Sequence, residues 1–137
     1  MNSIDTPSWI ENVTYDELSV GQSAHLRRTL TLADIQAFAA VSGDINPAHL
    51  DPEYANDTLF HGVIAHGMWG GSLISALLGT EFPGPGTIYL HQDLDFLRPV
   101  RVGDTLDVEV TVTAKEDEHH RRRSFFLLSR RCCDFSA

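Results

Sequence analysis

The sequence predicts a single α+β domain in which an antiparallel sheet wraps around one apolar helix. An alternating segment precedes the first helical pattern, two more follow residue 86, and the most apolar helical stretch, Val63 to Leu78, lies between them. The 137 residues suffice for one hydrophobic core and are too few for two. We therefore assign residues 1–137 to one domain.

A strand pattern followed directly by helix start and stop residues predicts the first strand and the first helix. The stretch "SAHLRRTLTL" alternates as a strand does. Thr31 then opens "TLADIQAFAAVSG" with Asp34 three residues later, which is typical of a helix amino terminus. Gly43 supplies the usual stop. One face of the expected helix carries Leu32, Ile35, Phe38, Ala39 and Ser42.

The next stretch, "SGDINPAHLDPEYA", groups acidic and imidazole side chains around a proline. Pro47 cannot continue a helix and favours an extended Asn46, so Asp44 and His49 are expected on a bent, non-helical connection. A carboxylate beside an imidazole can activate water and deliver a proton near neutral pH. On this pair alone, the better-supported interpretation is that Asp44 shapes a turn and His49 is an ordinary loop histidine.

The glycines of "HGVIAHGMWGGSLISALLG" have two expected uses. Gly67 stands where the apolar helix is expected to begin, and the unpaired amides of a helix start attract developing negative charge. Without a Cβ, Gly67 would let a substrate carbonyl approach its amide, as an oxyanion hole requires. Gly70 and Gly71 are expected to let a strand pack closely on the helix.

The same stretch gives weaker signals for other chemistry. His61 and His66 have no Cys, Asp or Glu at a familiar ligand spacing, so no metal site is expected. Ser75 lacks the Gly-x-Ser-x-Gly elbow of a serine hydrolase and is a candidate for lining a pocket. No phosphate-binding or dinucleotide fingerprint occurs, because "GPG" at residues 84–86 precedes a strand pattern.

Two alternating segments complete the expected sheet. In "TIYLHQDLDF" the apolar positions are Ile88, Leu90, Leu94 and Phe96, and in "TLDVEVTVTA" they are Leu106, Val108, Val110 and Val112. Between them, "RPVRVGD" has the proline and Gly-Asp chemistry of a turn. We therefore predict that the two segments form an antiparallel pair.

Charge and composition argue against one class of partner and indicate where in the cell the protein is expected. A net charge of -9 and a pI near 5.0 argue against nucleic-acid binding, which needs a basic face. The opening "MNSIDTPSWIENV" does not have the pattern of an export signal, and the apolar helix is interrupted by polar residues and glycines, so we expect a cytoplasmic protein with no membrane span. Cys132 and Cys133 are adjacent and are expected to be free thiols.

Three motifs together resemble one family. "DINPAHLD", then "HGVIAHGM", then "LDFLRPVRVGDTLDVEV" are similar in sequence and order to the MaoC-like (R)-specific enoyl-CoA hydratases, or hydratase 2, of hotdog fold. The similarity runs from about Leu18 to Ala114. It implies reversible hydration of short or medium trans-2-enoyl-CoA thioesters to (R)-3-hydroxyacyl-CoA, no cofactor, and a homodimer whose sheets join edge to edge.

The resemblance also assigns roles to residues. Asp44 would be the main water activator and His49 its partner and proton donor, with the bend at Pro47 bringing both to one face of the substrate. The Gly67 amide would hold the thioester oxygen, and Ser75 and Asn46 would contact the substrate. Considered from the residues themselves, a desolvated Asp44 would have its pKa raised toward neutrality while His49 can exchange protons, which is the division of labour that such a pair needs.

The tail from about Glu118 departs from the family pattern. "EHHRRRSFFLLSRRCCDFSA" lacks the glycine-containing turn and last alternating strand that the resemblance leads us to expect. We expect Ser124 to Leu128 to pair with the sheet and the remainder to fray, which would leave an open edge, low stability and a tendency to associate. The alternative is that "SRRCCDFSA" folds back over that edge.

Other activities remain open on these residues. Hotdog folds carry several thioester chemistries, so an acyl-CoA thioesterase or a dehydratase of a branched or dicarboxylic acyl-CoA is a rival within the enzymes. A non-catalytic acyl-CoA-binding module, in which Asp44 and His49 only shape a loop, is the rival outside them.

Overall fold

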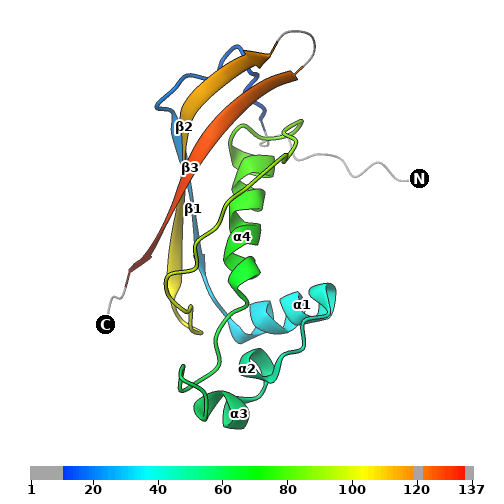
Figure 1. Ribbon diagram of the computed structural model, residues 1–137, viewed down its shortest axis with the longest axis vertical. Coiled ribbons are helices and arrows are strands. Elements are labelled where there is room, and N and C mark those ends of the chain that lie inside the picture. The colour runs from blue at the N-terminus through cyan, green and yellow to red at the C-terminus, as the bar shows by residue number, and fades with distance from the viewer. Residues whose placement is uncertain (1–10, 119–121, 135–137) are drawn as a thin grey trace, which may run out of the picture.

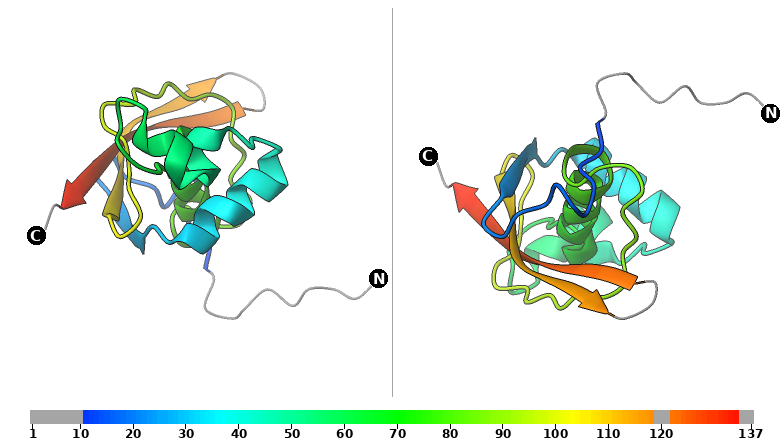
Figure 2. Two further views of the ribbon diagram at one scale, coloured as in Figure 1. Left: turned by 90° about the horizontal axis from the view of Figure 1, so that it is seen from below. Right: turned by 90° about the horizontal axis from the view of Figure 1, so that it is seen from above.

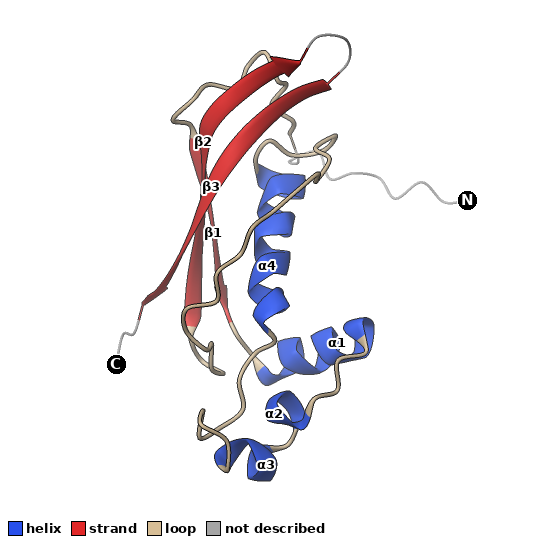
Figure 3. Ribbon diagram, viewed as in Figure 1, coloured by secondary structure: helices blue, strands red, loops and turns tan. Residues whose placement is uncertain are grey.

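The computed structural model describes residues 11–118 and 122–134. The described chain consists of helices, three strands and the irregular segments that connect them (Figures 1 and 3). In chain order the elements are β1 (Ser23–Thr29), α1 (Leu32–Ser42), α2 (Pro47–Leu50), α3 (Pro52–Asn56), α4 (Gly67–Ala76), the π-helical η1 (Leu77–Glu81), β2 (Thr105–Glu118) and β3 (Arg122–Asp134).

The sheet is antiparallel and curves along α4. Its strand order is β1-β2-β3, so β2 is hydrogen-bonded along both of its edges. A register shift between Val112 and Ala114 bends the pairing of β2 with β3. Seen from either end, the sheet lies on one side of α4, and α1 to α3 gather around the amino-terminal end of that helix (Figure 2). The α+β prediction, with a sheet around a central helix, is confirmed.

The core lies between β2 and α4. Leu106, Val108, Val110 and Val112 are all at most 1% exposed, as the alternation predicted. They join a buried cluster that includes Trp69, Leu73 and Leu77 from the helical side. No helix within the described ranges combines the length and the apolarity needed to cross a bilayer.

Helix α1 begins and ends where its signals predicted. The Thr31 hydroxyl accepts a hydrogen bond from the Asp34 amide (3.1 Å), and the Asp34 carboxylate accepts one from the Thr31 amide (2.9 Å). Gly43 ends the helix in the left-handed region, with φ of 77°. The buried face is narrower than expected, because Leu32 is 50% exposed.

The predicted strand over residues 88–96 is wrong. Residues 88–97 form no ladder in the structure and run past α4 as an irregular segment (Figure 1). Ile88, Leu90 and Phe96 are exposed, and Leu94 is partly buried against the core. Alternation alone does not make a strand, because a strand also needs a neighbour, and both edges of β2 are occupied by β1 and β3.

The tail pairs further than predicted. Residues 124–128 pair with β2 as expected, but the ladder continues to Asp134, which lies opposite Thr105. The expectation of a frayed end after Leu128 is therefore wrong through Asp134, and residues 135–137 lie outside the described residues. The long β2 strand supplies backbone partners along its whole edge, which the local apolar run did not reveal.

One helix boundary also differs from the prediction. Pro47 begins the short α2 helix instead of breaking one, since proline fits the first helical turn, where its missing amide is not needed. His49 is consequently helical. The apolar helix begins at Gly67, as expected, and residues 63–66 at the front of the apolar stretch lead into it without being helical.

Candidate active site

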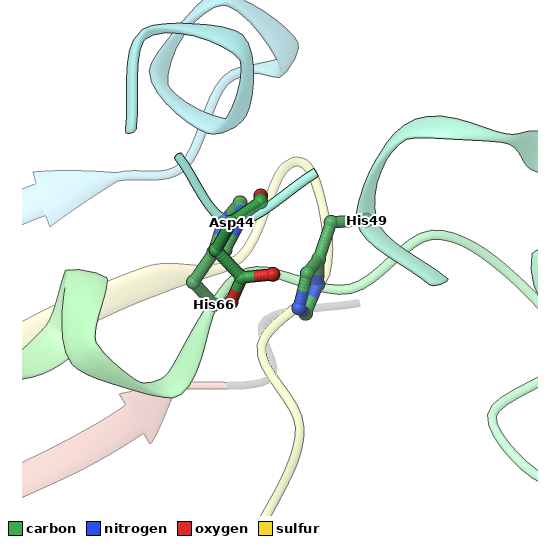
Figure 4. A group of neighbouring side chains, drawn as sticks. All are labelled: Asp44, His49 and His66. Atoms are coloured by element: carbon green, nitrogen blue, oxygen red, sulfur yellow. The ribbon is translucent and has the colours of Figure 1, made fainter. Parts of the chain in front are cut away.

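A pocket of about 370 Å³ opens where the end of α1, the Asp44 loop and the start of α4 meet. The residues that line it are Phe38, Ser42, Asp44, His66, Gly67, Met68 and Phe96. Two of the lining side chains that could carry chemistry, Asp44 and His66, lie beside His49, which is not itself among the lining residues (Figure 4). One nitrogen or oxygen atom from each lies within 4.8 Å of the others. The predicted juxtaposition of Asp44 and His49 is therefore present.

The Asp44 side chain is placed by the turn that follows α1. Its Oδ1 accepts a hydrogen bond from the Asn46 amide at 3.2 Å, and its own amide donates to the Ser42 hydroxyl at 3.1 Å. This Asx-type turn is the structural role that the sequence allowed for an aspartate here. Asp44 is exposed in the single chain, so the desolvation that was predicted for it is not provided by this chain alone.

The His49 ring has a fixed orientation. Its Nδ1 lies 2.8 Å from the Ile64 carbonyl oxygen, which can only accept a hydrogen bond, so Nδ1 carries a proton and donates. In the neutral ring Nε2 is then the acceptor, and in the protonated ring it is a donor. The single available nitrogen can serve as a proton donor or acceptor.

His66 is the site residue that sequence reasoning missed. It is 3% exposed, and its Nε2 lies 2.9 Å from the Asp44 carbonyl oxygen. Its ring stands 3.9 Å from the His49 ring, centre to centre, and 5.0 Å from the Phe38 ring. The available signal was its place directly before Gly67, at the start of the apolar helix.

The extended segment before α4 holds these parts together. It is attached to the chain ahead of β2 by the bridge between Ile64 and Arg101 and by a 2.8 Å hydrogen bond from the Ala65 amide to the Val100 carbonyl. From this support, Ile64 fixes the His49 ring, His66 reaches Asp44, and Gly67 begins the helix.

Gly67 occupies the predicted position at the first turn of α4. The first amides of a helix have no partner within it and carry the positive end of the helix dipole. A Cβ built on Gly67 would lie 3.0 Å from Cε1 of Phe96, closer than side chains normally approach. Any larger residue at this position would require the Phe96 ring or the helix start to shift by a few tenths of an ångström.

Asn46 and Ser75, the two further residues predicted to contact the substrate, do not line the pocket. The Asn46 Oδ1 accepts a hydrogen bond from the Ala48 amide at 3.0 Å and caps α2. Ser75 is an exposed residue of α4 and is not among the residues that line the pocket. Contacts of either residue with a substrate stay a prediction.

Asp44, His49 and His66 also bring together one carboxylate and two imidazoles, a donor set of the kind that metals use. The His49 Nδ1 and the His66 Nε2 each donate to a backbone carbonyl oxygen, so these two nitrogens are not available as ligands. The two rings lie face to face, with planes inclined by 31° at a centre-to-centre distance of 3.9 Å.

Comparisons with known proteins point to one family. The family described as "MaoC like domain" matches residues 17–125. A protein of Rhodospirillum rubrum named (R)-specific enoyl-CoA hydratase is 50% identical over 99 residues, which are 72% of this chain and 69% of that protein.

Solved structures agree with the sequence comparison. The (R)-hydratase of Aeromonas caviae, titled as involved in PHA biosynthesis, superposes with a TM-score of 0.80 at 45% identity, covering 88% of this chain and 89% of that chain. The unliganded R-hydratase of Pseudomonas aeruginosa gives a TM-score of 0.76 at 49% identity, covering 88% and 78%.

Proposed function

The chain belongs to the MaoC-like domain family, with the hotdog fold, and we propose that it is an (R)-specific enoyl-CoA hydratase, a hydro-lyase. It adds water reversibly to a trans-2-enoyl-CoA thioester and gives the (R)-3-hydroxyacyl-CoA. The observation that carries the proposal is that Asp44 and the Gly67 helix start line one pocket, while a ring nitrogen of His49 lies within 4.8 Å of the Asp44 carboxylate.

In the proposed reaction, Asp44 removes a proton from a water molecule and the water oxygen bonds to C3 of the enoyl group. The C2–C3 π electrons move toward the thioester carbonyl, whose oxygen becomes negative. The Gly67 amide stabilises that oxygen, since a preorganised donor at a helix start favours developing negative charge.

The protonated His49 Nε2 then delivers a proton to C2. The side chains of Asp44 and His49 lie close together, with polar atoms within 4.8 Å, which supports addition of both fragments of water to the same face (Figure 4). A proton shift from Asp44 to His49 restores both groups, so water is the only net reactant besides the thioester. The fixed Nδ1–H of His49 keeps Nε2 as the nitrogen that takes part.

We further propose a homodimer in the cytoplasm that needs no cofactor. The exposed apolar side chains of residues 88–97, among them Ile88 at 78% and Leu97 at 88%, favour a second copy as their cover. A second subunit or the bound acyl chain would also supply the burial that Asp44 lacks in the single chain. Sedimentation that gives a monomer at micromolar concentration, with full activity, would contradict the dimer.

The test of function follows the ultraviolet absorbance of the conjugated enoyl thioester on crotonyl-CoA and longer homologues. A fall in absorbance without release of free CoA thiol is the expected result. Release of thiol would instead identify a thioesterase, and tight acyl-CoA binding without any turnover would identify a binding module. Absorbance that stays constant for every chain length, with folded protein, would overturn the hydratase.

A further inference from the structure

We infer that His66 is a positioning residue that holds Asp44 and His49 in their reactive arrangement, an inference that rests on the proposed function of this pair. His66 touches both of them at once, although it is 22 residues from Asp44 along the chain. Its Nε2 bonds to the backbone of Asp44, and its ring faces the ring of His49 (Figure 4).

The contact to Asp44 acts on the backbone. The carbonyl oxygen of Asp44 accepts the bond, so the His66 Nε2 carries a proton, at 2.9 Å. Asp44 follows directly on Gly43, which ends α1, and the direction of its carboxylate depends on the backbone conformation there. A donor that fixes the Asp44 carbonyl therefore fixes where the carboxylate points.

The contact to His49 acts on the ring. The Ile64 carbonyl fixes one edge of the His49 imidazole, and the face of the ring lies against His66 at 3.9 Å. A hydrogen bond at one nitrogen leaves rotation about that bond, and the neighbouring ring restricts it. His49 is thereby held in both directions by a single short segment, residues 64–66.

His66 is suited to this task by its burial. At 3% exposed it is the buried polar side chain of the described core, and its Nδ1 has no hydrogen-bond partner within residues 11–118 and 122–134. A buried acceptor without a partner is costly, so its presence here needs an explanation. The hydrogen bond from the other nitrogen of the same ring supplies one, because an apolar core residue at this place would leave the Asp44 carbonyl without its donor.

Two substitutions at His66 separate the hydrogen bond from the ring. In His66→Gln the side-chain amide nitrogen stands at the position of Nε2, so the donor to Asp44 is kept while the ring is lost. In His66→Phe the ring is kept and the donor is lost. Matched substitutions at the exposed His25 of β1, His25→Gln and His25→Phe, control for the change of residue type.

We expect His66→Phe to lower kcat by about ten- to hundredfold, the scale of a slightly misplaced catalytic group, with KM changed by less than about threefold. His66→Gln should retain at least about fivefold more kcat than His66→Phe, because the donor acts on Asp44 directly. Thermal unfolding of each variant establishes that the protein is folded. If His66→Phe fails to fold, His66→Met, which also lacks the donor, takes its place.

A double-mutant cycle with Asp44→Asn then distinguishes positioning from a general defect. If His66 acts through Asp44, adding His66→Phe to Asp44→Asn should cost less than about threefold more, since the group being positioned is already lost. Three results would each overturn the inference. The double variant could lose kcat by the full product of the two single losses, His66→Gln and His66→Phe could lose equal activity, or a folded His66→Phe variant could be fully active. An Asp44→Asn variant with full activity would instead overturn the proposed role of Asp44.

Discussion

The ring of Phe96 lies directly over the backbone of Gly67, so that a Cβ at Gly67 would approach Cε1 at 3.0 Å and Cδ1 at 3.1 Å. Phe96 comes from the segment that passes α4 without joining the sheet, and it is 54% exposed. The apolar segment and the proposed oxyanion amide thus share one wall of the pocket.

This contact predicts that Gly67→Ala lowers kcat/KM by at least about tenfold, because the methyl group would press against the Phe96 ring and displace the ring or the Gly67 amide, both of which line the pocket. Gly79→Ala is the matched control, since a Cβ at Gly79 meets no atom within 4 Å. Steady-state hydration kinetics of both variants provide the comparison. Equal activities would show that the Gly67 amide is not approached by the substrate.

The proposed acid-base pair predicts that Asp44→Asn and His49→Gln each lower kcat by about a hundredfold or more. The double variant should lose less than the product of the two, because the groups act as a unit. The exposed Asp57 and His25 supply the controls Asp57→Asn and His25→Gln. A single variant at either position that keeps nearly full activity would remove that residue from the mechanism.

The reciprocal hydrogen bonds between Thr31 and Asp34 at the start of α1 predict a pH-dependent contribution to stability. The Thr31 backbone amide, and then the Arg28 side chain, hold the pKa of Asp34 below its ordinary value of 3.8. Because the pKa of Asp34 is lower in the folded state than in the unfolded chain, ionised Asp34 stabilises the fold at any pH above 3.8. This contribution is lost as the pH falls from 3.8 through the lower pKa of the folded state.

Asp34→Ala should therefore lower the free energy of unfolding by about 1 kcal/mol at neutral pH, as loss of a cap does, and by less at acidic pH. Gln36→Ala, at an exposed position of the same helix, should change stability little. Urea unfolding of the three proteins at both pH values measures the effect. A loss of the same size at acidic and neutral pH would mean that the carboxylate charge plays no part.

The register of β3 predicts a specific pattern of hydrogen exchange. Residues 130–134 pair with residues 105–109 of β2, and β3 is an outer strand among the strands described. In an antiparallel ladder with one neighbour, only alternate amides are bonded across to it. Residue-resolved exchange should show protection at alternate amides from Arg130 to Cys133, and uniformly fast exchange there would contradict the pairing.

The elements that could be predicted from sequence are those whose signals are local. Thr31, Asp34 and Gly43 mark the ends of α1 by chemistry within a few residues, and the alternation in β2 matches its four buried side chains. The connection that brings Asp44 and His49 together could also be predicted, although Pro47 begins a turn of helix there.

The features that could not be predicted depend on distant partners. Whether residues 88–97 form a strand depends on a neighbouring strand, and β2 pairs with β1 and β3 instead. His66 has no local ligand spacing, and its importance arises only when the chain returns to place it beside Asp44 and His49. Sequence spacing could not reveal contacts across 22 and 17 residues.

The most direct measurement of the central claim is the stereochemistry of hydration in D₂O. With crotonyl-CoA, we expect a 3-hydroxybutyryl-CoA with the (R) configuration at C3 and a single deuterium at C2, added to the face that received the hydroxyl group. Nuclear magnetic resonance of the product, with chiral analysis of the released acid, reads both centres. An (S) product, deuterium on the opposite face, a mixture of the two C2 configurations at early conversion, or no hydration at all would contradict the proposal that Asp44, His49 and Gly67 act together on one face of the thioester.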